Sequence, residues 1–351
     1  MQLLRADFRH EPKGTQMNKP LRIGLIGAGM VSRHHLMAWA DIADQAHVVA
    51  VTDPSQDNAA RRVAEFGIDR SYDDAEAMLA ATELDAIDIA APRQMHAPLV
   101  RLAAKRGLPV LCQKPLAPNL HEAIELAAEV KDKTRLMVHE NWRFRGYYRD
   151  AAAWLRAGRI GHVKQAQLTL LTSGVLPGPD GLRPALERQP FMRREKRMLV
   201  AEVLIHHLDT LRMLLGPMRV TAAGLSRSFS EMAGEDGAVI QLKAERGGAV
   251  TVFASFAAHG FPAAQVDRLD ILGDAGSIRL DGALLTCSGA SPAERRYDLA
   301  AEYQGSYNRT IAHFVQSLRE NTPFETAPED NIETLRLVED CYRLSGWEAK
   351  P

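Results

Sequence analysis

The sequence predicts an α/β Rossmann domain with a doubly wound parallel sheet, followed by an α+β domain with a largely antiparallel open sheet. Three observations lead to this prediction. Short apolar runs alternate with amphipathic stretches as far as about residue 140, a glycine-rich loop follows the first run, and later strand-like runs succeed one another with few helices between them. Buried strands that alternate with helices are typical of a parallel sheet covered on both faces.

The first domain is expected over residues 20–140. Its apolar runs end at glycine, proline or polar residues, and a helical pattern follows most of them. Asn119 is placed to cap the last helix of this domain, with Glu122 three residues further on, as in a capping box. The expected strands are "LRIGLIG", "HVVAVTD", "DAIDIAAP", "PVLCQKP" and "RLMVHE", and the expected helices span 30–39, 58–66, 97–106 and 119–133.

The second domain is expected over residues 141–351, where strand-like runs dominate. The segment 173–197 is a long, basic, Pro/Gly-rich insertion, which we interpret as a solvated loop rather than as a selector of anionic substrates. Its basic residues are Arg188, Arg193, Arg194, Lys196 and Arg197. The expected strands span 163–171, 220–225, 238–243, 249–256 and 268–272, "GDAGSIRLDG" reads as turn, strand and turn, and the last helices span 307–320 and 331–345.

Composition excludes several classes of function. The chain of 351 residues has a formal net charge of −1, which gives no general attraction to nucleic acid or to an anionic membrane. No apolar run is long enough to span a bilayer, and residues 1–19 lack the core of a signal peptide, so we expect a loose tail there. Cys112, Cys287 and Cys341 fit no zinc or disulfide pattern, which favours a reduced, cytoplasmic protein.

The segment "IGLIGAGMVSRHH" matches the dinucleotide-binding pattern G-x-G-x-x-G except at its last position. Gly27 permits the tight turn, and Gly29 lets the backbone approach a pyrophosphate at the N-terminus of the next helix. Ser32 takes the third position, which serves helix packing, and its hydroxyl would bond either a nearby carbonyl or the pyrophosphate. Asp53 ends the second strand about 20 residues further on, where an acid binds a ribose 2′-hydroxyl and favours NAD over NADP. An ordinary strand-to-helix turn is the alternative, but it does not account for all of these features.

Five motifs in order resemble the Gfo/Idh/MocA family of glucose–fructose oxidoreductases and inositol dehydrogenases. The glycine loop is followed by His35, "AAPRQMH" carries Pro92 and His96, and "VLCQKPLA", "ENWRF" and "EVLIHHLDTLRMLLG" follow in turn. The resemblance extends from Leu21 to about Ser345. Together with the loop, it implies cofactor contacts from Gly27, Gly29, Met30, Val31, Ser32, Asp53, Pro92, His96 and Lys114.

The resemblance implies that Lys114 is the active-site lysine beside the nicotinamide. The residue also lies at the carboxyl end of a parallel strand, where doubly wound domains bind ligands, and Pro115 restricts its backbone. Glu202 and His206 are four residues apart, so on an α-helix they share a face with Asp209. We therefore expect His206 to be the general base, Glu202 to orient it or relay its proton, and Lys114 to stabilise the oxyanion. Without the family, a core histidine on a leucine-rich helix would be the better interpretation.

Two positions depart from the family motifs. Gln113 stands where the family has the glutamate of "EKP", and Glu202 stands where it has an aspartate, so the proton path remains open. Arg143 and His207 are weaker substrate candidates, and a domain-hinge salt bridge is an equal alternative for Arg143. The aspartates of the second domain form no calcium-loop pattern, and no metal is expected. These aspartates are Asp270, Asp274 and Asp281.

The sequence therefore predicts an NAD-dependent oxidoreductase that transfers a hydride between nicotinamide and a hydroxyl carbon of a polyol, inositol, sugar or sugar acid. Two rivals remain: an NAD-assisted glycoside hydrolase of the same fold, and a sugar- or nucleotide-sensing regulator without turnover. A small carbohydrate or polyol is the expected partner, with no nucleic acid and no membrane. The family resemblance further implies a homodimer or homotetramer formed through the sheet of the second domain.

Overall fold

Six parallel strands form the first sheet, in the order β3-β2-β1-β4-β5-β6. The structure is a computed structural model that describes residues 19–348, so the expected tail at 1–19 lies outside the described residues except for its last member. The strand order reverses direction between β1 and β4, which is where doubly wound sheets bind ligands. The strands are β1 Leu21–Ile26, β2 Ala46–Thr52, β3 Arg70–Tyr72, β4 Ala86–Ile89, β5 Val110–Gln113 and β6 Leu136–His139.

Helices cover this sheet because several of its strands are mainly apolar and buried on both faces. Every residue of β4, β5 and β6 is buried. The predicted cap is present, since the Asn119 side chain accepts the backbone N–H of Glu122 at 3.0 Å. The connecting helices are α1 Ser32–Asp41, α2 Gln56–Phe66, α3 Ala75–Ala81, α4 His96–Ala104 and α5 Leu120–Val130, with a short 3-10 turn at Arg93–Met95.

Eight strands form the second sheet, in the order β14-β13-β12-β11-β7-β10-β9-β8. Every neighbouring pair is antiparallel except β7 with β10, so the predicted α+β architecture is confirmed. The strands are β7 Val163–Leu171, β8 Met218–Ser226, β9 Gly237–Ala244, β10 Ala249–Ser255, β11 Asp267–Gly273, β12 Gly276–Asp281, β13 Leu284–Gly289 and β14 Ala293–Arg296.

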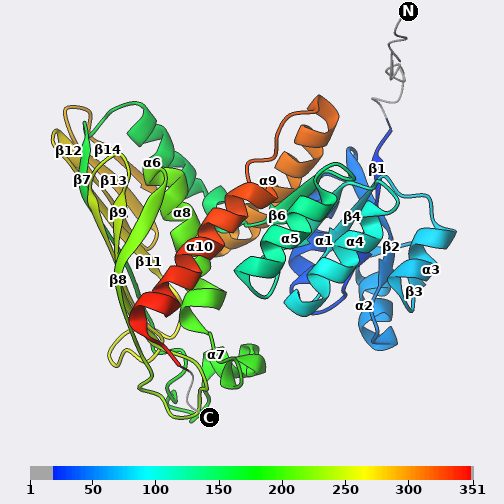
Figure 1. Ribbon diagram of the computed structural model, residues 1–351, viewed down its shortest axis with the longest axis horizontal. Coiled ribbons are helices and arrows are strands. Elements are labelled where there is room, and N and C mark those ends of the chain that lie inside the picture. The colour runs from blue at the N-terminus through cyan, green and yellow to red at the C-terminus, as the bar shows by residue number, and fades with distance from the viewer. Residues whose placement is uncertain (1–18, 349–351) are drawn as a thin grey trace, which may run out of the picture.

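Helices pack on one face of the second sheet, and its other face is open (Figure 1). Burial alternates along β9 and β10, as expected for a half-covered sheet. The open face carries three large exposed apolar side chains, Val239, Phe253 and Leu272. The helices of this half are α6 Gly146–Arg156, α7 Pro184–Arg188, α8 Ile205–Leu215, α9 Leu299–Glu320 and α10 Pro328–Ser345, with 3-10 turns at Trp142–Phe144 and Pro190–Arg193.

Helix α9 joins the two halves of the molecule, although it lies late in the chain. It packs against α1, and its Phe314 shares a buried apolar cluster with Ile23 of β1 and Trp39 of α1. Helix α10 contacts α5 on one side and α8 and β8 on the other. The two helices therefore hold the sheets in a fixed relation across the site (Figure 1).

Several elements were not predicted. The strands β3 and β14 are short and polar. The helices α3, α6 and α7, the strand β13 and the first turns of α9 were also not predicted. The largest difference is a π-helical turn at Leu199–Leu204, immediately before α8, where an ordinary α-helix was expected. No helix in the described part of the chain is both long and apolar enough to cross a bilayer.

Candidate active site

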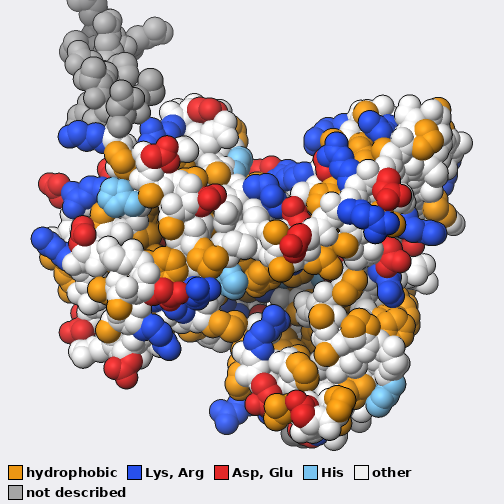
Figure 2. Space-filling view, turned by 180° about the vertical axis from the view of Figure 1, so that it is seen from behind, with side chains coloured by type: hydrophobic (Ala, Val, Ile, Leu, Met, Phe, Trp, Pro, Cys, Tyr) orange, Lys and Arg blue, Asp and Glu red, His pale blue; other side chains and the backbone are white. Residues whose placement is uncertain are grey.

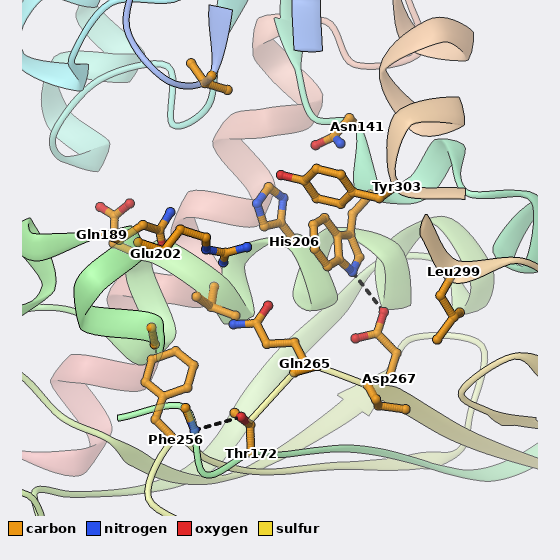
Figure 3. A pocket seen from close by; sticks show the side chains of 18 of the residues that line it. Asn141, Thr172, Gln189, Glu202, His206, Phe256, Gln265, Asp267, Leu299 and Tyr303 are labelled. Carbon is orange, nitrogen blue, oxygen red and sulfur yellow. Dashed lines mark hydrogen bonds between the residues drawn. The ribbon is translucent and has the colours of Figure 1, made fainter. Parts of the chain in front are cut away.

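A cavity of about 750 Å³ opens between the two halves of the molecule. It corresponds to the hollow between the two lobes in Figure 2. Met30, Val31 and Lys114 line it from the first sheet's side, and residues of α8, β11 and the 173–197 insertion line it from the other. Figure 3 shows His206, Tyr303 and Gln265 converging on it from different elements. A ligand here would contact both halves at once.

The glycine loop has the geometry that a pyrophosphate requires. Gly27 has a φ of +101°, and a Cβ there would lie 2.6 Å from the carbonyl oxygen of Ala90. A Cβ on Gly29 would meet nothing within 4 Å. Open space beside a glycine at the start of a helix is what close approach of a phosphate needs, so the loop fits a dinucleotide.

The serine that replaces the third glycine stabilises the loop rather than distorting it. Ser32 is fully buried, and its hydroxyl donates to the carbonyl oxygen of Gly29 at 2.6 Å. The guanidinium of Arg62 donates to both of these oxygens, at 3.1 Å and 3.0 Å. The Ser32 hydroxyl was expected to bond either a nearby carbonyl or the pyrophosphate, and in the structure it bonds the carbonyl.

Asp53, at the end of β2, is hydrogen-bonded to the glycine loop. Its carboxylate accepts the backbone N–H of Ala28 at 2.7 Å and that of Ser55 at 2.8 Å. The side chain is only partly buried and keeps further lone pairs available. It is therefore in position to accept ribose hydroxyls at the end of β2.

Lys114 is held by the second half of the molecule. Its ammonium donates to the main-chain carbonyl of Glu202 at 2.8 Å and lies 3.7 Å from the Glu202 carboxylate. The same carboxylate also accepts from Arg93, which in turn pairs with Glu195 of the insertion. Arg93 thus links the first half to two acids of the second, beside the cavity.

His206 presents one ring nitrogen to the cavity and the other to an acid. Its Nδ1 lies 2.5 Å from Oε1 of Glu140, a carboxyl with no exposed surface. The indole of Trp142 stacks on the imidazole with centroids 4.6 Å apart and planes at 17°. Burial, and then the charge of Lys114, hold the pKa of His206 well below its usual value, so the imidazole is neutral at pH 7.

The expectation that Glu202 orients His206 is wrong. The acid bonded to His206 is Glu140, which follows β6, while the Glu202 carboxylate turns toward Arg93 and Lys114. Glu202 and His206 both line the cavity, but the cations Arg93 and Lys114 bind the Glu202 carboxylate, and Glu140 approaches His206 from the end of β6. Asp209, three residues after His206 on α8, binds Arg143.

Arg143 and His207 are structural, contrary to their expected contact with substrate. Arg143 is buried and pairs with Asp209 at 2.5 Å and with Asp330 at 2.6 Å, which is the salt-bridge alternative. His207 is fully buried and bonds Asp267 at 2.9 Å. Neither side chain lines the cavity.

Two further predicted cofactor residues flank the 3-10 turn after β4. Pro92 immediately precedes this turn, and His96 follows it. Both ring nitrogens of His96 face backbone carbonyls, of Pro115 at 2.7 Å and of Ala91 at 2.9 Å. His96 is buried, which lowers its pKa, so its imidazole braces the segment around Lys114 instead of offering a free nitrogen.

The residues of this site that sequence reasoning missed include Glu140, Trp142, Arg145 and Arg93. The guanidinium of Arg145 lies 3.3 Å from the centroid of Trp142, on which it stacks. Asp267 accepts hydrogen bonds from the Trp142 indole at 3.0 Å and from the Tyr148 hydroxyl at 3.0 Å. The quoted "ENWRF" contains two of these residues, but no feature of that segment indicates which of its side chains face His206.

Fold and site together define a dinucleotide-dependent oxidoreductase. Residues 21–141 match the oxidoreductase family with an NAD-binding Rossmann fold, and residues 155–345 match its C-terminal α/β domain. The chain therefore belongs to the Gfo/Idh/MocA family. This membership confirms the prediction of an oxidoreductase that uses NAD.

Similar proteins act on sugars and polyols. The chain is 34% identical to a D-apiose dehydrogenase of Paraburkholderia graminis, over 95% of this chain and 89% of that one. It is 27% identical to an inositol 2-dehydrogenase of Streptomyces avermitilis, over 86% and 85% of the two chains. Its structure is similar to that of an oxidoreductase from Agrobacterium radiobacter in complex with NAD+, L-tartaric acid and magnesium, with a TM-score of 0.86, 28% identity and coverage of 93% and 96%.

No metal site accompanies this cavity in residues 19–348, where no group of three or more His, Cys, Asp or Glu side chains is placed to hold an ion. The three cysteines are buried and free.

Proposed function

We propose that the protein is an NAD-dependent dehydrogenase that oxidises a hydroxyl carbon of a polyol, inositol, sugar or sugar acid, with D-apiose as the first candidate. One observation carries the proposal: an ammonium, Lys114, and a neutral imidazole, His206, reach the same cavity from different halves of the molecule. Oxidation of an alcohol needs both a base for the hydroxyl proton and a positive charge for the developing oxyanion. The similarity to D-apiose and inositol dehydrogenases supports this substrate class.

Each residue has a defined task in this reaction. NAD, when bound, accepts the hydride from the alcohol carbon. His206 takes the hydroxyl proton on the nitrogen that faces the cavity, and Lys114 donates a hydrogen bond to the same oxygen. The bond from Lys114 to the Glu202 carbonyl keeps the ammonium aimed across the domain boundary. Tyr303, which lines the cavity beside His206, helps to exclude water there (Figure 3).

The polar groups around the cavity are suited to a substrate with several hydroxyls. Asn141, Thr172, Gln189 and Gln265 supply uncharged donors and acceptors (Figure 3). The guanidinium of Arg145 is already occupied by Trp142 and by Asp267 at 3.4 Å. These uncharged groups suit the hydroxyls of a sugar, and Arg188 of the insertion, which also lines the cavity, supplies a charged donor for the carboxylate of a sugar acid.

Asp53 supports a preference for NAD over NADP. A carboxylate at the end of β2 accepts ribose hydroxyls and repels a 2′-phosphate. Activity with NADP that equals or exceeds activity with NAD would contradict this assignment.

The open face of the second sheet supports assembly into a homodimer or homotetramer. Three large apolar side chains, Val239, Phe253 and Leu272, are each more than two-fifths exposed on strands of this sheet. Replacing Phe253 with lysine should lower the mass measured by light scattering after gel filtration. A monomeric wild type would refute this part of the proposal.

A dehydrogenase screen tests the proposed function. Purified protein is incubated with D-apiose, inositols, aldoses and uronates, each with NAD and with NADP, and reduced cofactor is measured by absorbance. Lys114→Ala is the matched variant, and it should keep NADH binding while losing at least about 100-fold in kcat.

The alternatives give different results. Turnover of a glycoside with no net NADH would identify a hydrolase. NAD binding without turnover of any compound, in the wild type as in the variant, would identify a sensor.

A further inference from the structure

We propose that Glu140 is the positioning residue of His206 and receives, through it, the hydroxyl proton of the substrate. The inference rests on the proposed dehydrogenase activity and adds a second member to its base. No feature of the sequence pointed to Glu140, whose carboxyl belongs to the end of β6 and not to the helix that carries His206.

The contacts of Glu140 leave it one main partner. Its Oε1 lies 2.5 Å from Nδ1 of His206 and accepts the backbone N–H of Trp142 at 3.2 Å. Its Oε2 is buried and has no hydrogen-bond partner in the described part of the chain. Because the Trp142 indole also stacks on the imidazole, the ring can neither rotate nor exchange its partner for water.

The two ring nitrogens then act as a relay. With Glu140 ionised, Nδ1 carries the proton that is donated to Oε1, and the nitrogen facing the cavity has a free lone pair. The substrate proton binds that nitrogen as the Nδ1 proton moves to Oε1, and the C–H electron pair leaves as hydride to oxidised NAD. The products are a carbonyl, a neutral imidazole of the opposite tautomer and a neutral carboxyl. The imidazole therefore never has to hold a net charge.

Burial makes this arrangement favourable. A full positive charge on His206 would be costly, since burial and Lys114 both lower its pKa. Burial raises the pKa of Glu140 to about 7, so the carboxyl gains or loses its proton near neutral pH. The other titratable or charged groups around the pair are Lys114, His139, Arg143, Arg145, His207, Asp209 and Tyr307.

The direction of the pH dependence follows from the relay. Oxidation requires ionised Glu140, so kcat for oxidation should rise with pH and level off above about 7. Reduction of the carbonyl starts from protonated Glu140, so kcat in that direction should fall over the same range. Glu202 cannot produce this pattern through His206, because its carboxylate binds Arg93 and Lys114 instead.

The test compares Glu140→Gln with Glu202→Gln in the full chain, since both variants remove one negative charge near Lys114. In E140Q the new amide oxygen would still accept from Nδ1 of His206 but could not take its proton. We expect E140Q to lower kcat for oxidation about 100-fold, to keep KM and the NADH dissociation constant within about threefold, and to lose the rise of kcat near pH 7. We expect E202Q to retain that rise.

Glu140→Asp is the control for a folding defect in E140Q, because it keeps the carboxyl while shortening the side chain. It should recover part of the lost kcat together with the pH-dependent rise. The proposal is overturned if E140Q keeps the wild-type pH profile, or if E202Q is the variant that loses it.

The failure of the proposed function would be visible separately, as a wild type that turns over no substrate. In that case ¹⁵N NMR of labelled histidine still tests the pair. The tautomer of His206 should switch near pH 7 in the wild type and stay fixed in E140Q, and a tautomer that is constant in both proteins would refute the proposal.

Discussion

The two glycines of the cofactor loop should respond differently to the same substitution. In Gly27→Ala, the new Cβ would lie 2.6 Å from the Ala90 carbonyl oxygen, on a backbone with a φ of +101°. The backbone conformation costs about 1–3 kcal/mol and the overpacking about 1–3 kcal/mol, so the free energy of unfolding should fall by about 2–6 kcal/mol. In Gly29→Ala, the Cβ meets nothing within 4 Å, and stability should change by less than about 0.5 kcal/mol.

NADH binding should be weakened by Gly29→Ala, although this substitution leaves the free energy of unfolding nearly unchanged. Gly29→Ala fills the space that a pyrophosphate needs, so it should weaken NADH binding at least about tenfold in a protein that is as stable as the wild type. Urea unfolding of the apo-protein measures the free energy of unfolding, and fluorescence titration with NADH measures the dissociation constant of the cofactor. Wild-type NADH affinity in Gly29→Ala would refute the placement of the pyrophosphate over this glycine.

Two other substitutions test what the structure assigns to buried polar groups. Arg143→Ala leaves the buried Asp209 carboxylate without its guanidinium partner, so the free energy of unfolding should fall by about 3–5 kcal/mol. KM for the substrate should stay unchanged in the folded protein. A raised KM at wild-type stability would show that Arg143 contacts the substrate. Ser32→Ala removes the bond to the Gly29 carbonyl and should cost about 1 kcal/mol in urea unfolding with little change in NADH affinity. A large loss of affinity would mean that the hydroxyl contacts the cofactor.

The fold could be predicted because its signals are local. Apolar strands that end in glycine or proline, and caps such as Asn119, depend on residues close together in the sequence. The position of α9 could not be predicted in this way. Its contact with α1 joins residues more than 250 positions apart, and an amphipathic helix carries no mark of the sheet on which it packs.

The site was predicted in part for the same reason. Lys114 and His206 carry motifs that can be recognised, and both line the cavity. The partner of His206 could not be found, because Glu140 is 66 positions away in the sequence and reaches the imidazole only in the folded chain. Glu202 lines the cavity with His206, but its carboxylate binds Arg93 and Lys114, which come from other parts of the chain. Nothing in "LVAEVL" indicates that these two cations bind Glu202.

One departure from the family motifs, Gln113, makes sense when it is considered together with Glu140. Gln113 pairs with His139 across the β5–β6 ladder, so it lies beside the strand end that carries Glu140. Its amide nitrogen donates to Nε2 of His35 at 2.8 Å and lies 3.3 Å from Nδ1 of His139, two nitrogens that need a donor. A glutamate at position 113 would have no proton to give when ionised, and it would put a second negative charge near a buried acid. Glutamine at 113 therefore suits a site whose acid is Glu140.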